Sequence, residues 1–283
     1  MRYDLSPLLK LKNTTMPSTF TANNADKYQL YQYSVQSADV DAEFLYDTYQ
    51  EERGYAPKHL REDFCGTCLL SAHWLQLNND TSVEAYDIDS EPLSWGLEHN
   101  LLPLGEIASH CQQFNADARE PSSFSPDVRC AQNFSYWVFK TRQEMLEYFT
   151  GAYHDLADDG IFVIDLHGGP DSCLEQEEET DIEEHNFTYV WDQHHYHPIN
   201  NQASLSIHFR FPDGTELTDA FTYEWRIWGL AELRDILHDA GFQQVDCYWE
   251  GTAEDGESGN GIFTKETMGE ACPAYVAYLV GVK

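Results

Sequence analysis

A small-residue turn and an acidic side chain 21 positions further along have the spacing of a ligand site. The extended run Leu60–Cys65 stops at Gly66–Thr67, and a helix-patterned stretch, Leu69–Leu77, follows at once. Asp87 ends the next strand-like run. In a strand–loop–helix unit, small residues let backbone N–H groups approach a ligand, and an acid on the next strand can accept hydrogen bonds from ribose hydroxyls. The spacing therefore predicts a site for an adenosine-containing cofactor.

Two kinds of cofactor share this plan, the nicotinamide or flavin dinucleotides and S-adenosylmethionine. A dinucleotide site favours the pattern Gly-x-Gly-x-x-Gly, because a pyrophosphate must approach the backbone closely. The loop after Asp63 contains one glycine, Gly66. Glu62 and Asp63 would repel a pyrophosphate and suit an amino group and a sulfonium. The loop favours S-adenosylmethionine, and a nicotinamide-dependent oxidoreductase is the weaker alternative.

Four motifs resemble those of the class I S-adenosylmethionine-dependent methyltransferases, in the order typical of that family. They are Cys65–Thr67 after a strand, Ala85–Asp89, Phe114–Ala118, and Leu230–Phe242 with its Leu-x-x-Leu-x-x-x-Leu spacing. The resemblance covers roughly residues 55–283. The family's first motif has an acid followed by a glycine-rich turn. Here Glu62 takes the acid position, whereas Phe64 and Cys68 stand where the first and last glycines are usual.

The resemblance implies, position by position, which residues contact the cofactor. Asp87 would bind the ribose hydroxyls and Ile88 would flank the adenine. Asp117 and the Ala118 amide would contact the adenine edge. The segment Ala131–Tyr136 resembles the exit of the fourth strand, beneath the methionine moiety and the substrate. The predicted cofactor-binding residues are Glu62, Phe64, Cys65, Gly66, Thr67, Asp87, Ile88, Asp117, Ala118 and Asn133.

The implied reaction is an in-line displacement at a sulfonium methyl. Positioning the acceptor and excluding water would supply most of the acceleration. An amine or hydroxyl acceptor must lose a proton, and the resemblance places three candidate bases near the open end of the cofactor, Tyr136, His167 and Tyr31. Tyr31 and Tyr33 could instead form an aromatic lid, and core packing is the ordinary explanation for such rings. A sensor or scaffold that keeps the pocket without activity is the non-enzyme alternative.

Two further clusters leave alternatives open. Cys65 and Cys68 match a Cys-x-x-Cys spacing, but no second pair accompanies them, so small loop residues are favoured over a zinc or redox site. His195 and His197 share one face of a predicted strand, and with His194 they could hold a metal or contact the substrate. Exposed histidines on a hairpin need no ligand, however. No metal site is therefore predicted.

Periodicity and turn signals predict the elements that position these residues. Apolar residues at helical spacing predict two helices over 25–53, the second ending at Gly54. The expected strands are the run that enters Cys65, then 82–87, 110–115, 128–135 and 161–166, with an antiparallel pair at 244–250 and 274–280. The expected helices between them are 69–77, 90–102 with Asp89 as a candidate N-cap, and the segment containing Met145, Phe149 and Leu156. This alternation predicts a parallel sheet covered by helices.

Residues 168–228 depart from the alternation. The acidic run Glu175–Glu184 is expected to be an exposed, mobile linker, because its charges repel one another. Alternating apolar residues on both sides of Asp213–Gly214 predict a β-hairpin, and Phe187–Asp192 is expected to add a third strand. In similar methyltransferases, additions at this point cover the substrate.

The predicted fold class is α/β, a Rossmann-like, seven-stranded methyltransferase sheet. It is mostly parallel, with a terminal antiparallel hairpin and helices on both faces. The predicted divisions are an N-terminal extension with a helical lid (1–54), the cofactor-binding domain (55–167 and 229–283), and an inserted antiparallel β subdomain that covers the substrate (168–228).

The net charge of the chain limits the kinds of partner that we expect it to bind. The 283 residues, 42% of them hydrophobic, suffice for one enlarged domain. With 16 basic and 49 acidic residues the net charge is −33, which opposes binding to nucleic acid and to anionic lipid and tolerates neutral or cationic small molecules. The acidic coat fits a protein working in high salt equally well. We expect a small-molecule methyl acceptor, no nucleic acid or membrane partner, and a monomer or homodimer.

The cellular location is predicted from leader signals and cysteines. Met1–Pro7 lacks the apolar core of a leader, and no stretch approaches the ~18 apolar residues of a membrane span. Seven cysteines, an odd number, argue against a disulfide framework. The sequence therefore predicts a cytoplasmic protein with reduced thiols.

Overall fold

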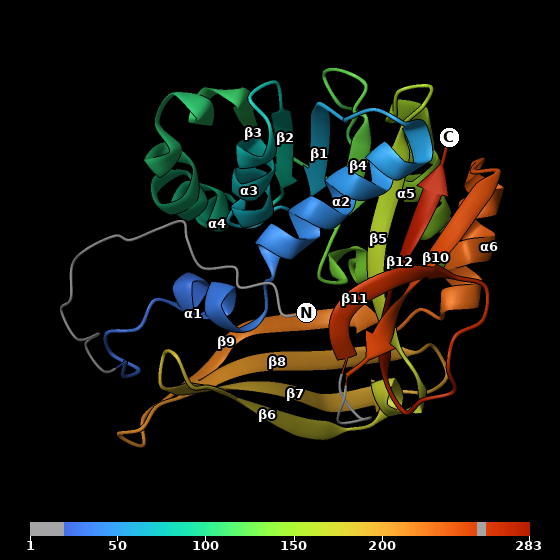
Figure 1. Ribbon diagram of the computed structural model, residues 1–283. Helices are drawn as coiled ribbons and strands as arrows, with labels where there is room; N and C mark the ends of the chain where they lie inside the picture. Colours follow the sequence, from blue (N-terminus) through green and yellow to red (C-terminus); the bar gives the residue numbers. More distant parts are fainter. Residues whose placement is uncertain (1–19, 254–258) are drawn as a thin grey trace.

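Two β-sheets and a short helix between them form the frame of the molecule (Figure 1). The structure, a computed structural model, describes residues 20–253 and 259–283. The first 19 positions of the predicted 1–54 extension, including Met1–Pro7, lie outside the described residues. The smaller sheet runs across one end of the larger one, and the helix α1, Lys27–Ser34, lies between them.

The larger sheet has eight strands in the order β11-β10-β12-β5-β4-β1-β2-β3. The strands are β1 His59–Asp63, β2 Ser82–Asp87, β3 Cys111–Asn115, β4 Val128–Ala131, β5 Ile161–Gly168, β10 Gln244–Thr252, β11 Gly259–Glu266 and β12 Tyr275–Val282. The pairs among β1 to β5 are parallel, whereas β12 is antiparallel to both β5 and β10. The predicted mostly parallel sheet with a terminal antiparallel hairpin is confirmed.

The eighth strand, β11, was not predicted, since seven strands were expected. It pairs antiparallel with β10 at the edge of the sheet. Seven of its eight residues are exposed, and the remaining one is half-buried. A strand that buries neither face shows no alternation of apolar and polar residues, which is the sequence signal for a strand.

Helices cover both faces of this sheet. Besides α1 they are α2 Ala38–Arg53, α3 Leu69–Leu77, α4 Ser90–Gly96, α5 Arg142–Asp155 and α6 Leu230–Ala240. Most buried residues of α2 and α3 belong to one core cluster, and those of α5 and α6 belong to another. Gly54 ends α2 in a left-handed conformation, as predicted. Asp89 caps α4, because its carboxylate accepts a hydrogen bond from the Glu91 N–H at 2.9 Å.

The segment predicted as one helix over 90–102 changes its winding. The helix α4 ends at Gly96, and a π-helical turn follows at Leu97–Leu101. The next helical turns are of the 3-10 type and contain Gly105 at φ +68°. A side chain at Gly96 would overlap the backbone of Thr67, so glycine at this position lets α4 pack directly on the loop after β1.

The fourth strand is shorter than predicted. It ends at Ala131 rather than Ser135, because Asn133 and Phe134 take left-handed conformations with φ of +56° and +55°. Asp165, on β5, holds this bend. Its carboxylate accepts hydrogen bonds from the N–H groups of Asn133, at 2.7 Å, and Phe134, at 3.0 Å.

The smaller sheet is antiparallel, with the order β6-β7-β8-β9. Its strands are β6 Gln176–Ile182, β7 Phe187–His197, β8 Gln202–Arg210 and β9 Glu216–Arg226. The predicted hairpin and third strand are present, although β7 runs beyond Asp192 to His197.

The prediction of a mobile linker at Glu175–Glu184 is wrong, because most of that segment is β6. Strand pairing with β7 places successive acids on opposite faces. Glu177 and Glu179 both form ion pairs with Arg210, which offsets their mutual repulsion. An acidic edge strand is also a common protection against pairing with another chain.

Candidate functional site

The loop after β1 keeps the shape of a glycine-rich turn although it contains one glycine. Phe64, Gly66 and Cys68 all have left-handed backbones, with φ of +57°, +50° and +56°. Phe64 and Cys68 stand where glycine was expected, and each such conformation costs a non-glycine residue about 1–2 kcal/mol. The surrounding packing therefore holds the turn in a strained conformation, which is characteristic of functional loops.

The carboxylate of Asp87 lies beside this turn. It accepts hydrogen bonds from the N–H groups of Gly66 and Asp89, each at 2.8 Å. Burial raises the pKa of Asp87 above its usual range. A Cβ added to Gly66 would meet no atom within 4 Å. The turn and the carboxylate thus border open space.

That space is a cavity of about 290 Å³, here called the loop cavity. Six of the predicted cofactor-binding residues line it, namely Phe64, Cys65, Gly66, Thr67, Asp87 and Asn133. Lining residues that the sequence analysis missed are Lys27, Tyr28, Gln36, Phe221 and Trp225. They come from α1, from the segment after it, and from β9. No pattern in the sequence links these segments to the loop, because only the fold brings them together.

The helix α1 forms one wall of the loop cavity. The Gln32 side-chain amide donates to Thr67 Oγ1 at 2.8 Å, and the Tyr28 hydroxyl donates to Glu91 at 2.9 Å. The ring of Tyr31 lies 4.9 Å from that of Phe221 on β9. This helix therefore connects the loop after β1 with the smaller sheet.

Gln36 presents an unsatisfied acceptor at the loop cavity. Its Oε1 atom is buried and accepts no hydrogen bond from the described residues, and the residue lines the cavity. A buried acceptor without a donor carries a desolvation penalty of about 1–3 kcal/mol. A ligand that brings an N–H or O–H group into the loop cavity would satisfy this atom.

Two predicted cofactor contacts, Glu62 and Ile88, lie outside the lining. Glu62 is buried beneath the loop, where its carboxylate accepts the Ser71 N–H at 3.0 Å and the Ser71 hydroxyl. Burial raises the pKa of Glu62 to about 8. Ile88, in contrast, is 74% exposed next to Asp87.

Asp117 and Ala118 also lie outside the lining. Arg119 donates to Asp117 from Nε, at 2.9 Å, and from Nη2, at 2.6 Å, and it lowers the pKa of that carboxyl. Ala118 is buried, and its carbonyl accepts hydrogen bonds from Arg61 at 2.8 Å and Arg129 at 2.6 Å.

The two arginines belong to a buried ionic network that the sequence analysis missed. Asp63, at the end of β1, accepts from Arg61 Nε at 2.8 Å, from Arg129 Nε at 2.7 Å and from the Tyr148 hydroxyl at 2.7 Å. Asp155 accepts from the same two arginines at 3.0 and 3.1 Å. The network joins β1, β4 and α5 to the Ala118 carbonyl and so holds the loop after β3.

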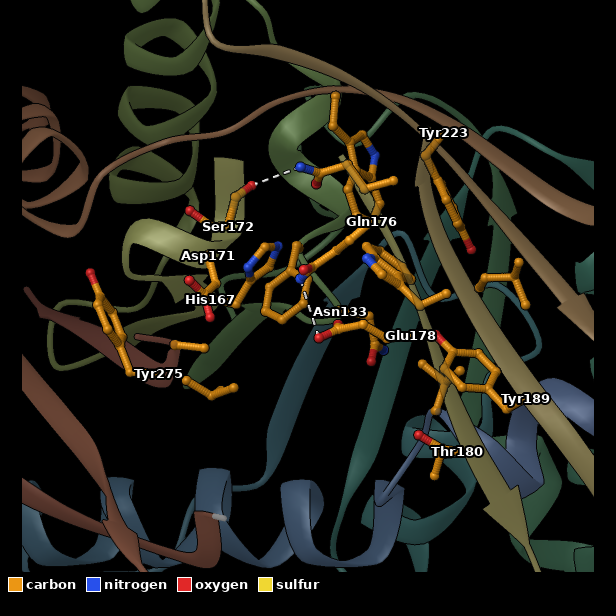
Figure 2. Close-up of a pocket in the computed structure, with 18 of the residues that line it drawn as sticks. Asn133, His167, Asp171, Ser172, Gln176, Glu178, Thr180, Tyr189, Tyr223 and Tyr275 are labelled. Atoms are coloured by element: carbon orange, nitrogen blue, oxygen red, sulfur yellow. Dashed lines mark hydrogen bonds between the residues drawn. The ribbon is translucent and has the colours of Figure 1, made fainter. Parts of the chain in front are cut away.

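A second cavity of about 460 Å³, here called the inner chamber, lies next to the loop cavity. The two share four lining residues, Tyr31, Asn133, Tyr223 and Trp225. Figure 2 shows His167, Asn133, and Gln176 and Glu178 of β6 among the residues that line the inner chamber. The chamber thus lies between the carboxyl end of the larger sheet and the inner face of the smaller one.

His167 is one of the two candidate bases that line the inner chamber (Figure 2). Its ring packs 4.7 Å from Phe134 and 4.8 Å from Trp137, and its nitrogens form no hydrogen bond with the described residues. Burial lowers the pKa of His167 to about 4. The imidazole is therefore neutral near pH 7, with a free nitrogen that can accept a proton.

The other two candidate bases are placed differently. Tyr136 is fully buried and donates its hydroxyl to the Asp165 carbonyl at 2.7 Å, and burial raises its pKa well above the usual range. It lines neither cavity. Tyr31 lines both cavities, as Tyr223 does, and burial raises the pKa of Tyr31 to about 12.

Asp165 is a further residue that the sequence analysis missed. It anchors the Asn133–Phe134 bend, and burial raises its pKa to about 7. Like Asp87, it is an acid near the end of a buried strand. The signal that identified Asp87 could therefore have identified Asp165.

The histidine cluster lies on the smaller sheet. The Nδ1 atom of His195 is 3.2 Å from Glu175, and the rings of His195 and His197 are 6.3 Å apart. Within residues 20–253 and 259–283, no group of three or more histidine, cysteine and acidic side chains is arranged to hold a metal ion. Within the same ranges, no helix is both long and apolar enough to cross a membrane.

Comparisons with known proteins find similar structures. No protein-family model and no curated protein matches the sequence. An S-adenosylmethionine-dependent methyltransferase from Clostridium acetobutylicum is 14% identical, with a TM-score of 0.66 over 90% of this chain and 96% of that one. DesVI from Streptomyces venezuelae is 16% identical, with a TM-score of 0.66 over 91% and 97%.

A third similar structure was solved with S-adenosylmethionine bound. It is CalS10, an amino pentose methyltransferase from Micromonospora echinaspora, 13% identical, with a TM-score of 0.64 over 91% of this chain and 97% of that one. At such identities the likeness establishes the fold. The chain has the α/β fold of the S-adenosylmethionine-dependent methyltransferases.

Proposed function

We propose that this protein is an S-adenosylmethionine-dependent methyltransferase that transfers a methyl group to a small-molecule acceptor. The observation that carries the proposal is the pair of adjoining cavities, which meet at Asn133 and Tyr31. A transfer between two bound molecules needs two adjacent sites whose ligands meet at one point. The loop cavity supplies one site and the inner chamber supplies the other.

The residues around the loop cavity fit this cofactor. The Asp87 carboxylate can accept hydrogen bonds from ribose hydroxyls, and the unpartnered Gln36 Oε1 can accept one from an ammonium group. Ile88, exposed beside Asp87, is available to cover an adenine ring, and the Asp117–Ala118 loop would contact its edge. When bound, S-adenosylmethionine supplies an electrophilic methyl group on its sulfonium. The single glycine of the loop disfavours a pyrophosphate and hence a nicotinamide cofactor.

The chain's own residues would orient the acceptor, exclude water and move a proton. The strained Asn133–Phe134 bend, fixed by Asp165, would position the acceptor's nucleophile at the junction of the cavities. His167 is the base that the geometry favours, because its neutral imidazole faces the chamber without a partner among the described residues. Tyr31 would close the junction between the two cavities. The buried Tyr136 would hold Asp165 in place, because its hydroxyl donates a hydrogen bond to the Asp165 carbonyl.

The proposal extends to the surroundings of the enzyme. The similar structures include an amino pentose methyltransferase and a sugar N-methyltransferase, which supports a small-molecule acceptor. The net charge of −33 supports the exclusion of nucleic acid. We also infer a cytoplasmic location and a monomer or homodimer.

Titration of the purified protein with S-adenosylhomocysteine and with NADH tests the proposal. We expect S-adenosylhomocysteine alone to bind. Asp87→Asn should weaken that binding by about 5- to 150-fold, the equivalent of 1–3 kcal/mol, because a charged acceptor is lost from the ribose. Asp80→Asn is the matched control. This acid lies at a surface turn 3.9 Å from Lys58 and contacts neither cavity, so its loss should change nothing.

Three other results would each contradict a part of the proposal. Binding of NADH would favour the oxidoreductase. Binding of S-adenosylhomocysteine without turnover in a broad acceptor screen would favour the non-catalytic sensor. Equal affinity in the Asp87→Asn variant and the wild type would remove the assigned role of Asp87.

A further inference from the structure

The inner chamber carries negative charge without a cation to neutralise it. Three acids line it, Asp171, Glu178 and Glu250. No lysine or arginine is present among the described residues of its lining. The histidine of the lining, His167, is neutral near pH 7, because burial lowers its pKa to about 4. The chamber would therefore oppose an anionic ligand and attract a cationic one.

The alternation along β6 places Glu178 on the face of the strand opposite Glu177 and Glu179. Glu178 lies on the inner face of the strand with Gln176 and Thr180, and it accepts a hydrogen bond from Gln176 at 3.3 Å. Glu177 and Glu179 lie on the opposite face, where Arg210 pairs with both. The outward acids thus have a counter-charge, whereas the inward acid has a neutral amide.

Aromatic rings form the wall of the chamber that belongs to the smaller sheet. The rings of Tyr223 and Trp225 on β9 are 4.4 Å apart. Trp191 on β7 lies 6.1 Å from Trp225 and 6.4 Å from Tyr223. Faces of tryptophan and tyrosine attract organic cations through the ring quadrupole, with tryptophan the strongest. The aromatic wall and the acids therefore both favour a positively charged organic ligand.

His167 adds an independent indication of a proton-bearing ligand. Its ring is half-buried and faces the chamber, and its nitrogens form no hydrogen bond with the described residues. A ligand in the chamber would supply the missing partner. The nitrogen is therefore available to a group that carries a proton into the chamber.

We propose that the methyl acceptor is an organic amine that enters the inner chamber as an ammonium ion, held by Glu178 and the aromatic wall. This inference rests on the proposed function and names its acceptor class. It also selects nitrogen over oxygen as the methylated atom, because a neutral alcohol would leave the chamber's acids without a counter-charge.

The proton and the electrons balance as follows. The ammonium nitrogen loses one proton by way of His167 to solvent water and thereby regains its lone pair, because a pKa of about 4 does not let the imidazole retain the proton. That nitrogen then bonds to the methyl carbon while the methyl–sulfur bond breaks, and the bonding electrons stay on sulfur. The acceptor R–NH3+ becomes R–NH2+–CH3, S-adenosylhomocysteine is the second product, and His167 releases its proton to solvent. No oxidant or reductant is required.

Binding of two molecules of the same shape tests the inference. Choline carries a quaternary ammonium, and 3,3-dimethylbutan-1-ol replaces its nitrogen by carbon. Calorimetric titration of each into the full-length protein saturated with S-adenosylhomocysteine should show choline binding about tenfold tighter or more. Glu178→Gln should remove most of this preference.

Glu177→Gln is the matched control, because it removes the same charge from the neighbouring position on the opposite face of β6. A preference that arises only from the overall charge of −33 would fall equally in both variants. The affinity of each variant for S-adenosylhomocysteine reports whether its fold is intact. The inference requires the choline preference to fall in Glu178→Gln and to persist in Glu177→Gln.

Equal binding of the two probes, no detectable binding of either, or an unchanged preference in Glu178→Gln would overturn the inference. The proposed function fails separately. Binding of S-adenosylhomocysteine without a choline preference would rule out the amine acceptor and leave the proposed methyltransferase function unaffected. A choline preference in a protein that does not bind S-adenosylhomocysteine would leave a cation-binding chamber and remove the methyltransferase.

Discussion

Four non-glycine residues with left-handed backbones gather at the ends of two adjacent strands. Phe64 and Cys68 follow β1, and Asn133 and Phe134 follow β4. Each of the two loops lines the loop cavity. Conformations of this kind persist only where the surroundings determine them, and they cluster at functional sites. The strain thus marks the same site that the Gly66–Asp87 spacing indicated.

His167 is expected to stay neutral over an unusual pH range. The ordinary histidine pKa is about 6.5, whereas burial lowers that of His167 to about 4. Nuclear magnetic resonance of the 15N-labelled imidazole, assigned by comparison with a His167→Gln variant, should show no protonation between pH 8 and pH 5. A transition near the ordinary value would show that solvent or an acid reaches the ring, and the assigned environment would be wrong.

Among the elements, β1 and β4 depend on the buried ionic network below the site. Asp63 accepts hydrogen bonds from both Arg61 and Arg129, and none of these three side chains is more than 2% exposed. Asp63→Asn should lower the free energy of unfolding by about 3–5 kcal/mol, because it removes the fully buried one of the two carboxylates that Arg61 and Arg129 share and leaves them only the partly exposed Asp155. Urea denaturation of the cofactor-free protein measures the loss.

Asp117→Asn is the comparison for that experiment. Asp117 also pairs with an arginine, Arg119, but these side chains are 32% and 46% exposed. A pair open to solvent contributes about 0–1 kcal/mol. If the two variants lost the same stability, Asp63 would not hold the β1 and β4 strands together.

Elements with strong periodicity could be predicted from the sequence, and elements without it could not. The helix Leu69–Leu77 and the strand Ser82–Asp87 were predicted to the residue, because each pairs one apolar pattern with a clear turn. The strand β6 was taken for a linker, since charge repulsion was weighed without the counter-charge of Arg210. The mostly exposed β11 shows no alternation of apolar and polar residues.

The same limit applies to the candidate site. Loop residues near Gly66 carry a local motif and were found, and they line one cavity as a group. Gln36, Phe221 and Trp225 reach that cavity from segments far apart in the chain, so no local pattern contains them. The roles of the β6 acids could not be predicted either, because they depend on the face of the strand on which each acid lies.

The molecule as a whole contains three acids whose pKa values are raised by burial to about 6 or higher. Burial raises the pKa of Asp41 to about 6, that of Asp165 to about 7 and that of Glu62 to about 8. In the unfolded chain these groups ionise near pH 4. Between those values the folded state binds more protons than the unfolded state, so their contribution to stability is present at low pH and falls as the pH rises. The lowered pKa of His167 has the opposite effect. Between about pH 4 and about pH 6.5 the folded state binds fewer protons at this histidine than the unfolded state does, so the contribution of His167 to stability rises as the pH rises.

Glu62→Gln isolates one of these contributions. The amide keeps an acceptor for the Ser71 N–H and cannot ionise. From pH 5 to pH 8 the wild type should lose stability relative to this variant, by up to about 1.4 kcal/mol per pH unit. Urea denaturation of both proteins across this range measures the difference. Parallel pH profiles would mean that Glu62 is ionised in the folded protein and that its burial has been misjudged.

A crystal structure of the protein with S-adenosylhomocysteine tests the central claim most directly. We expect density in the loop cavity, with both ribose hydroxyls within hydrogen-bonding distance of the Asp87 carboxylate. The sulfur should face the opening to the inner chamber beside Asn133. Density elsewhere on the molecule, or an empty loop cavity at saturating ligand, would contradict the account.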